Sequence, residues 1–141
     1  MKKLGILFVC LVFGTVSIMA QTSDNKENAA NKPVIKFDKT VHNYGTIEYQ
    51  SDGTCKFEFE NTGSEPLLLT KVRSSCGCTT PRWPKEPVKP GEKETIKVKY
   101  NTRIHGSFSK TIWVYSNADN SPITLRIKGK VVRNLDSNSN K

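Results

Sequence analysis

The feature that most constrains the fold of this chain is a regular alternation of polar and apolar residues over short segments. The segment TCKFEFEN (residues 54–61) places one cysteine and two phenylalanines on one side of an extended chain and three charged residues on the other. The segment ETIKVKYN (residues 94–101) alternates in the same way. Because successive side chains of a β-strand point to opposite faces, both segments predict strands with one buried face. No window holds apolar residues at a sustained helical spacing, so the sequence predicts an all-β protein.

Further strands are predicted between clusters of turn-forming residues. They are VIKFDK (34–39), HNYGTIEY (42–49), LLLTKV (67–72), SFSKTIWVYSN (107–117) and ITLRIKGKVV (123–132). The segment TPRWPKEPVKPGE (80–92) predicts a loop, because its prolines lack the amide donors that a central strand needs. About seven strands in about 100 residues predict one immunoglobulin-like β-sandwich domain over residues 33–133.

The beginning of the chain predicts export. Residues 1–20 combine a basic start, a long apolar stretch and the small residue Ala20, which is the order of a secretory signal peptide. We expect cleavage after Ala20 and a periplasmic or extracellular protein with no membrane span after cleavage; a retained N-terminal anchor is the alternative. A lipid on Cys10 is disfavoured, because this residue lies inside the apolar stretch. Residues 21–32 and 134–141 are polar and predict a disordered linker and a disordered tail.

The charge and the missing motifs exclude several classes of function. Loss of Lys2 and Lys3 with the signal peptide lowers the formal net charge from +9 to +7. The remaining lysines are scattered along strands, which is typical of a solvated strand face and not of a nucleic-acid site; weak attraction to anionic glycans or membranes is the alternative. No metalloprotease, hydrolase, dinucleotide or phosphate-loop motif occurs, and no helix pairs two carboxylates. We therefore expect no enzymatic activity and no cofactor.

Three cysteines remain after the predicted cleavage: Cys55, Cys76 and Cys78. Cys55 lies on the apolar side of its strand, so we expect it to be buried. Cys76 and Cys78 flank one glycine, and three interpretations stay open: a bend of small residues, a disulfide, and an open thiol pair. An extended chain separates such α-carbons by about 6.5 to 7 Å, at the limit for a disulfide, so a bridge needs a tight bend at Gly77.

Two further expectations follow if Cys76 and Cys78 are an open thiol pair. The nearby charges of Arg73 and Arg82 would favour the thiolate forms, so the pair should react before Cys55. Two thiolates suit Cu(I) or zinc but supply only half of a tetrahedral zinc site. A third ligand would have to come from a distant position; the candidates are His42, His105 and Cys55. No metal site is therefore predicted with its full set of ligands.

Two residues of the proline-rich segment are candidates for a partner surface. Trp83 and Arg82 lie between prolines, where an exposed aromatic side chain would suit protein recognition. The alternative, which we favour, is that Trp83 caps an open end of the sandwich.

The order of several motifs also carries a resemblance. The segments HNYGTI, FEFENTGSEPLLL, RSSCGCTTP, VKPGE, TIWVYSN and LRIKGKV occur in the order typical of a bacterial family of exported Ig-like domains, the domain of unknown function 1573. Its hallmark is an S-C-G-C-T segment, and the resemblance covers residues 35–132. In fold this family is similar to Hydin-type and major-sperm-protein-type Ig-like domains, which act mainly in protein interactions. The resemblance implies fold, export and bacterial origin, and it implies no activity.

The residues and the resemblance together predict a binding or adaptor module of the cell envelope. We expect a monomer with a protein partner that the sequence does not identify. A Cu(I)-binding or redox site at Cys76 and Cys78 is one alternative, and a purely structural envelope domain is the other.

Overall fold

The computed structural model describes residues 31–133, so the predicted signal peptide, most of the predicted linker and the predicted tail lie outside the described residues. Within them the chain forms eight strands and no helix, and therefore no helix that could span a membrane. The strands are β1 (Ile35–Phe37), β2 (Val41–Glu48), β3 (Thr54–Asn61), β4 (Leu69–Ser74), β5 (Thr79–Arg82), β6 (Lys93–Tyr100), β7 (Gly106–Ser116) and β8 (Ile123–Val132).

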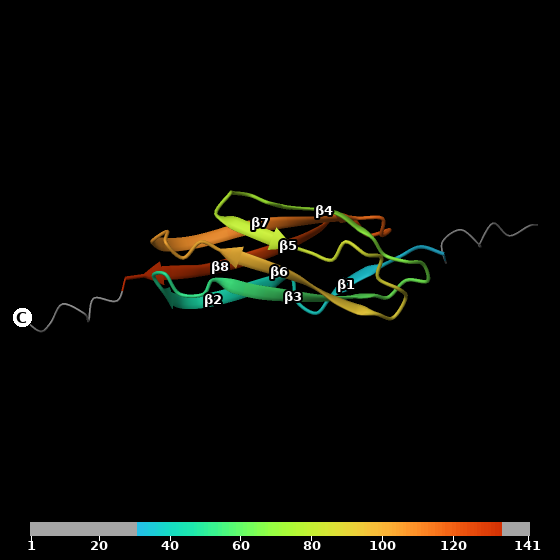
Figure 1. Ribbon diagram of the computed structural model, residues 1–141, viewed down its shortest axis with the longest axis horizontal. Helices are drawn as coiled ribbons and strands as arrows, with labels where there is room; N and C mark the ends of the chain where they lie inside the picture. Colours follow the sequence, from blue (N-terminus) through green and yellow to red (C-terminus); the bar gives the residue numbers. More distant parts are fainter. Residues whose placement is uncertain (1–30, 134–141) are drawn as a thin grey trace, which may run out of the picture.

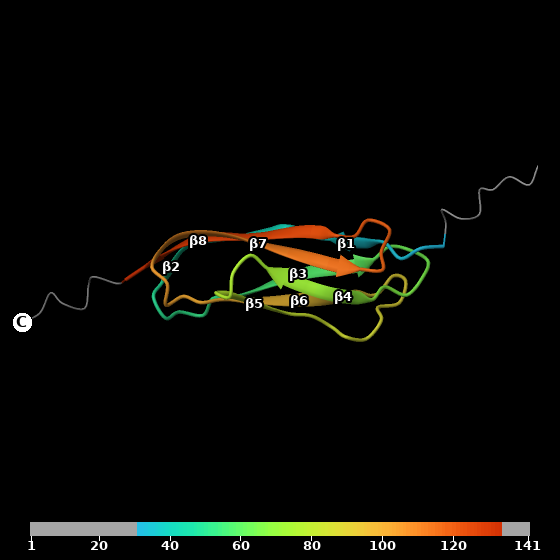
Figure 2. The same ribbon diagram turned by 90° about the horizontal axis from the view of Figure 1, so that it is seen from above.

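Two four-stranded sheets form the predicted sandwich. One sheet has the strand order β1-β3-β6-β5 and the other has the order β2-β8-β7-β4. Neighbouring strands are antiparallel except for β2 and β8, which run parallel. Figures 1 and 2 show that the strands run roughly along the long axis of the domain, with the two ends of the described chain at opposite ends of this axis.

The core lies between the sheets and follows the alternation in the sequence. In β3 every second residue is buried, beginning with Cys55, and the intervening residues point to solvent. The side chains of Phe57 and Ile96 are fully buried in one sheet, and those of Ile112 and Leu125 are fully buried in the other. Burial of each such side chain stabilises the fold by about 1.5 to 3 kcal/mol. This packing makes the sandwich a rigid support for the loops at its ends.

One predicted loop contains a strand. The sequence assigned residues 80–92 to a loop, but β5 (Thr79–Arg82) includes Pro81 and pairs with β6. The reason is the position of β5 at the edge of its sheet, where only one side needs ladder hydrogen bonds. The domain therefore has eight strands where the sequence predicted about seven.

Candidate functional site

The C-G-C segment lies where the chain crosses from one sheet to the other. Strand β4 ends at Ser74 in the β2-β8-β7-β4 sheet, and β5 begins at Thr79 in the β1-β3-β6-β5 sheet. Between them Cys76 and Cys78 form a disulfide, with 5.3 Å between their α-carbons. This separation lies inside the usual range for disulfides and well below that of an extended chain, so the segment makes the tight bend that a bridge requires.

Gly77 is not needed for the reason that the sequence suggested. Its φ lies outside the left-handed region that favours glycine, and a Cβ at this position would meet no atom within 4 Å. The side of Gly77 on which a Cβ would lie is therefore open to solvent, and a small side chain would fit there.

Hydrogen bonds to both sheets hold the bend. The amide of Ser75 donates to the Thr111 carbonyl in β7 (2.9 Å), and the amide of Thr111 donates to Ser75 Oγ (3.2 Å). On the other side the amide of Asn101, just after β6, donates to the carbonyl of Cys78 (2.8 Å). The hydroxyl of Ser74 lies 2.7 Å from the Cys76 carbonyl. Both cysteines thus lie on a backbone fixed by the scaffold.

A buried hydroxyl lies close to the disulfide, and a lysine lines a hollow next to it. Thr79 is 2% exposed, and its Oγ1 lies 3.8 Å from Cys76 Sγ and 3.9 Å from Cys78 Sγ. A hollow of about 280 Å³ opens beside the bend, lined by Gly77, Cys78, Thr80, Lys99, Tyr100 and Asn101. Lys99 lines this hollow, whereas the predicted cations Arg73 and Arg82 do not. The disulfide itself is partly exposed.

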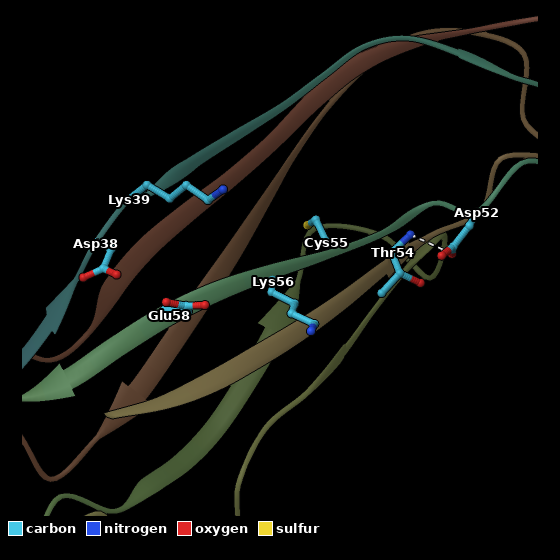
Figure 3. Close-up of a pocket in the computed structure, with 7 residues that line it drawn as sticks. All are labelled: Asp38, Lys39, Asp52, Thr54, Cys55, Lys56 and Glu58. Carbon is cyan, nitrogen blue, oxygen red and sulfur yellow. Dashed lines mark hydrogen bonds between the residues drawn. The ribbon is translucent and has the colours of Figure 1, made fainter. Parts of the chain in front are cut away.

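Cys55 has a very different environment. It is free and buried, as predicted, and it lies on the wall of a second hollow of about 560 Å³, whose other lining residues are Asp38, Lys39, Asp52, Thr54, Lys56 and Glu58 (Figure 3). Burial raises the pKa of the Cys55 thiol, although a hydrogen bond with the Tyr44 hydroxyl opposes this rise in part. Cys55 is therefore a poor nucleophile.

The candidate metal ligands do not gather. Within residues 31–133 no group of three or more His, Cys, Asp or Glu side chains is placed to hold a metal ion. The ring of His42 packs edge-on against Tyr44 at 4.5 Å between centroids, and the ring of His105 stacks on Tyr49 at 4.5 Å. Both histidines thus have packing roles.

Trp83 packs against the core cluster, and the side chain of Lys85 lies over its ring. The ammonium of Lys85 lies 3.3 Å from the ring centroid, and the buried indole N–H has no hydrogen-bond partner among the described residues. A capping role requires such packing, and that role remains a prediction. Arg82 is exposed at the end of β5, and a partner surface formed by Arg82 and Trp83 remains a prediction.

The structure places two aromatic residues, Trp113 and Tyr115, on the outer surface of β7, and neither was among the site residues predicted from the sequence. Ile112 and Val114 point into the core, so Trp113 and Tyr115 alternate onto the outer face of β7, where both are partly exposed. In the register of the sheet, Arg73 of β4 lies opposite Trp113. Neither the indole N–H of Trp113 nor the hydroxyl of Tyr115 bonds to another described residue. The period-two alternation of residues 107–117 contained the signal that separates these four residues.

Comparisons with known proteins place this geometry in context. A family described as "Protein of unknown function (DUF1573)" matches residues 35–131. A search of curated proteins found no match.

Solved structures share the fold at low sequence identity. A protein of unknown function from Porphyromonas gingivalis W83 is 18% identical with a TM-score of 0.65; the match covers 77% of this chain and 51% of that one, so this chain spans about half of its length. The ASH/PapD-like domain 7 of human CEP192 is 9% identical with a TM-score of 0.62, over 73% and 88% of the two chains. The Vibrio cholerae VesB protease matches over 72% of this chain and only 32% of its own, at 13% identity and a TM-score of 0.55. These likenesses show the fold alone.

Proposed function

The chain belongs to the family described as protein of unknown function DUF1573, and we propose that it is an exported, non-enzymatic protein-binding module of the cell envelope. The proposed export rests on the order of residues in the first 20 positions. The proposed binding role rests on the outer face of the β2-β8-β7-β4 sheet.

The observation that carries the proposal is the exposed aromatic pair Trp113 and Tyr115. Trp, Tyr and Arg are the residue types that contribute most often to binding hot spots, and Arg73 lies directly across from Trp113. The polar groups of both aromatic side chains are free of partners within residues 31–133, so they can donate to a bound protein. We define the aromatic face as Lys71, Arg73, Trp113, Tyr115 and Thr124.

The charge of the aromatic face limits the kind of partner. Lys71 lies opposite Tyr115, and Arg73 lies opposite Trp113, so each aromatic side chain has a cation beside it. No ion pair within the described residues neutralises either cation. A complementary protein surface would therefore present apolar groups surrounded by carboxylates.

Site-specific photocrosslinking in the native host tests this proposal. A photoreactive phenylalanine analogue replaces Trp113 or Tyr115, and the matched control places it at Lys97, which is exposed on β6 in the opposite sheet. We expect one discrete crosslinked protein from the first two positions, abolished by Arg73→Glu, and none from position 97. Equal crosslinking from both faces, or none from the aromatic face, would contradict the proposal.

The proposed export has its own measurement. The intact mass of the protein purified from the periplasmic or extracellular fraction should correspond to a chain that begins at Gln21. A mass that includes residues 1–20 would contradict cleavage, and recovery only from the cytoplasm would contradict export.

A further inference from the structure

The disulfide between β4 and β5 should contribute little to the stability of the fold. Cys76 and Cys78 are only 2 positions apart. A bridge stabilises a fold mainly by removing loop entropy from the unfolded chain, and this contribution falls as the closed loop becomes shorter. The backbone hydrogen bonds of Ser75 and Cys78 already fix the crossing from both sheets. Stability therefore does not explain why the chain has a disulfide at this position.

The surroundings of the two sulfurs favour a thiolate. The hydroxyl of Thr79 lies within 4 Å of both sulfurs and makes no other hydrogen bond to a described residue. It can donate to either sulfur when that sulfur becomes negative, which is the stronger, charge-assisted form of the bond. Lys99 lines the same hollow as Cys78, and a positive charge in that hollow would lower the free energy of a thiolate there.

The two sulfurs are not equivalent. Cys78 packs against the core cluster, whereas Cys76 does not belong to the residues packed there. Both cysteines are partly exposed, so a small reductant can reach the bridge from solvent. Cys76 Sγ, which is not packed against the core, is therefore the sulfur that an attacking thiolate meets. Cys78 Sγ is then the leaving sulfur, and the Thr79 hydroxyl lies 3.9 Å from it.

From this geometry we propose that Cys76 and Cys78 form a thiol–disulfide exchange site that accepts two electrons from a dithiol reductant. A thiolate of the reductant attacks Cys76 Sγ, a new intermolecular S–S bond forms, and the Cys76–Cys78 bond breaks with its electron pair on Cys78 Sγ. The second thiol of the reductant then loses its proton and attacks the first sulfur of the reductant, which is bonded to Cys76 Sγ in the mixed disulfide. Cys76 leaves as a thiolate, the reductant leaves as a disulfide, and the two cysteines take up the two protons.

Reduction kinetics of the purified, oxidised chain test the proposal, with dithiothreitol as the dithiol and thiol-labelling mass spectrometry as the readout. Thr79→Val removes the hydroxyl with little change of shape, and we expect it to slow reduction at least fivefold, because hydrogen bonds to charged groups are strong. Thr79→Ser keeps the hydroxyl and should react within twofold of the native chain. Lys99→Gln should slow reduction about threefold, whereas Lys97→Gln, outside the hollow, should have no effect.

A second measurement tests the direction of attack. A short incubation with glutathione, a monothiol, followed by an acid quench should place glutathione on Cys76 in more than about nine of ten mixed disulfides. Cys55→Ala is included to remove the third thiol and should leave the rates unchanged. Circular dichroism must show that each variant is folded.

A purely structural bridge gives other results. A Thr79→Val rate within twofold of the native rate, equal labelling of Cys76 and Cys78, or resistance of the native chain to millimolar dithiothreitol would each overturn the proposal. The residues of this site are separate from the aromatic face, so its failure and the failure of the proposed binding role are distinguishable.

Discussion

The buried side chain of Asn61 should contribute more to stability than any other polar side chain at the β1 end of the sandwich. It is 0% exposed, and its amide makes four hydrogen bonds to backbone groups. The Nδ2 group donates to the carbonyls of Glu65 (2.7 Å) and Val88 (2.9 Å). The Oδ1 atom accepts from the amides of Gly63 (3.1 Å) and Val34 (3.4 Å). One side chain thus joins the residue before β1, the β3–β4 turn and the segment before β6.

The cost of Asn61→Ala follows from these contacts. A buried hydrogen bond contributes about 1 kcal/mol net, and an unpaired partner left behind adds to the loss. The Val88 carbonyl also accepts from the Leu67 amide (2.8 Å) and stays paired, and the 3.4 Å contact of Val34 is weak. We therefore expect a loss of about 3 kcal/mol in the free energy of unfolding. For a domain of this size the melting temperature should fall by roughly 12 to 24 °C.

Urea unfolding followed by circular dichroism measures this loss, and Asn117→Ala is the matched control. The Asn117 side chain also bonds to backbone groups, the Pro66 carbonyl (3.0 Å) and the Leu68 amide (2.8 Å), but it is exposed, so water can replace it. We expect a loss of about 1 kcal/mol or less for the control. If the two losses differ by less than about 1 kcal/mol, the reasoning from burial is refuted.

Two further predictions concern glycine positions and pH. A Cβ at Gly53 would collide with the Tyr100 carbonyl oxygen, whereas a Cβ at Gly77 would contact no atom. We therefore expect Gly53→Ala to lower the melting temperature strongly and Gly77→Ala to keep both the fold and the disulfide. Similar melting temperatures of the two variants would contradict this expectation. Burial, and to a smaller extent the charge of Lys39, lowers the pKa of His42 below its ordinary value of 6.5. The unfolded chain then binds a proton at His42 more tightly than the folded chain does. The stability that the fold gains from keeping His42 neutral is therefore complete above pH 6.5 and is lost as the pH falls through the folded pKa. An NMR titration that gives a folded pKa at or above 6.5 would contradict it.

The strands with one buried face could be predicted from the sequence because their signal is local. The segment predicted for residues 54–61 and strand β3 (Thr54–Asn61) have the same bounds, since the alternation and the flanking turns lie within the segment itself. Strand β5 could not be predicted, because its proline is tolerated only through its place at the sheet edge. That place depends on pairing with β6, about 20 residues further along the chain.

The state of the C-G-C segment could not be decided by its spacing. The distance between the α-carbons depends on how sharply the chain bends, and the bend is held by Thr111 and Asn101, which are remote in sequence. Arg73 and Arg82 are near the two cysteines in sequence, but neither lines the hollow next to Cys78. In a strand, side chains at neighbouring positions point to opposite faces, so nearness in sequence does not place a charge beside a given side chain.

The position of Lys99, which lines the same hollow as Cys78, follows from the alternation that builds the core. Thr79 lies opposite Tyr100 in the β5–β6 register, and both side chains point inward and are buried. The next pair, Thr80 and Lys99, must therefore point outward at the edge of the hollow. A shift of β5 by one residue would bury Thr80 and turn the Thr79 hydroxyl away from the sulfurs. Burial of the core thus fixes the register, and the register places the hydroxyl and the ammonium group on which the proposed exchange depends.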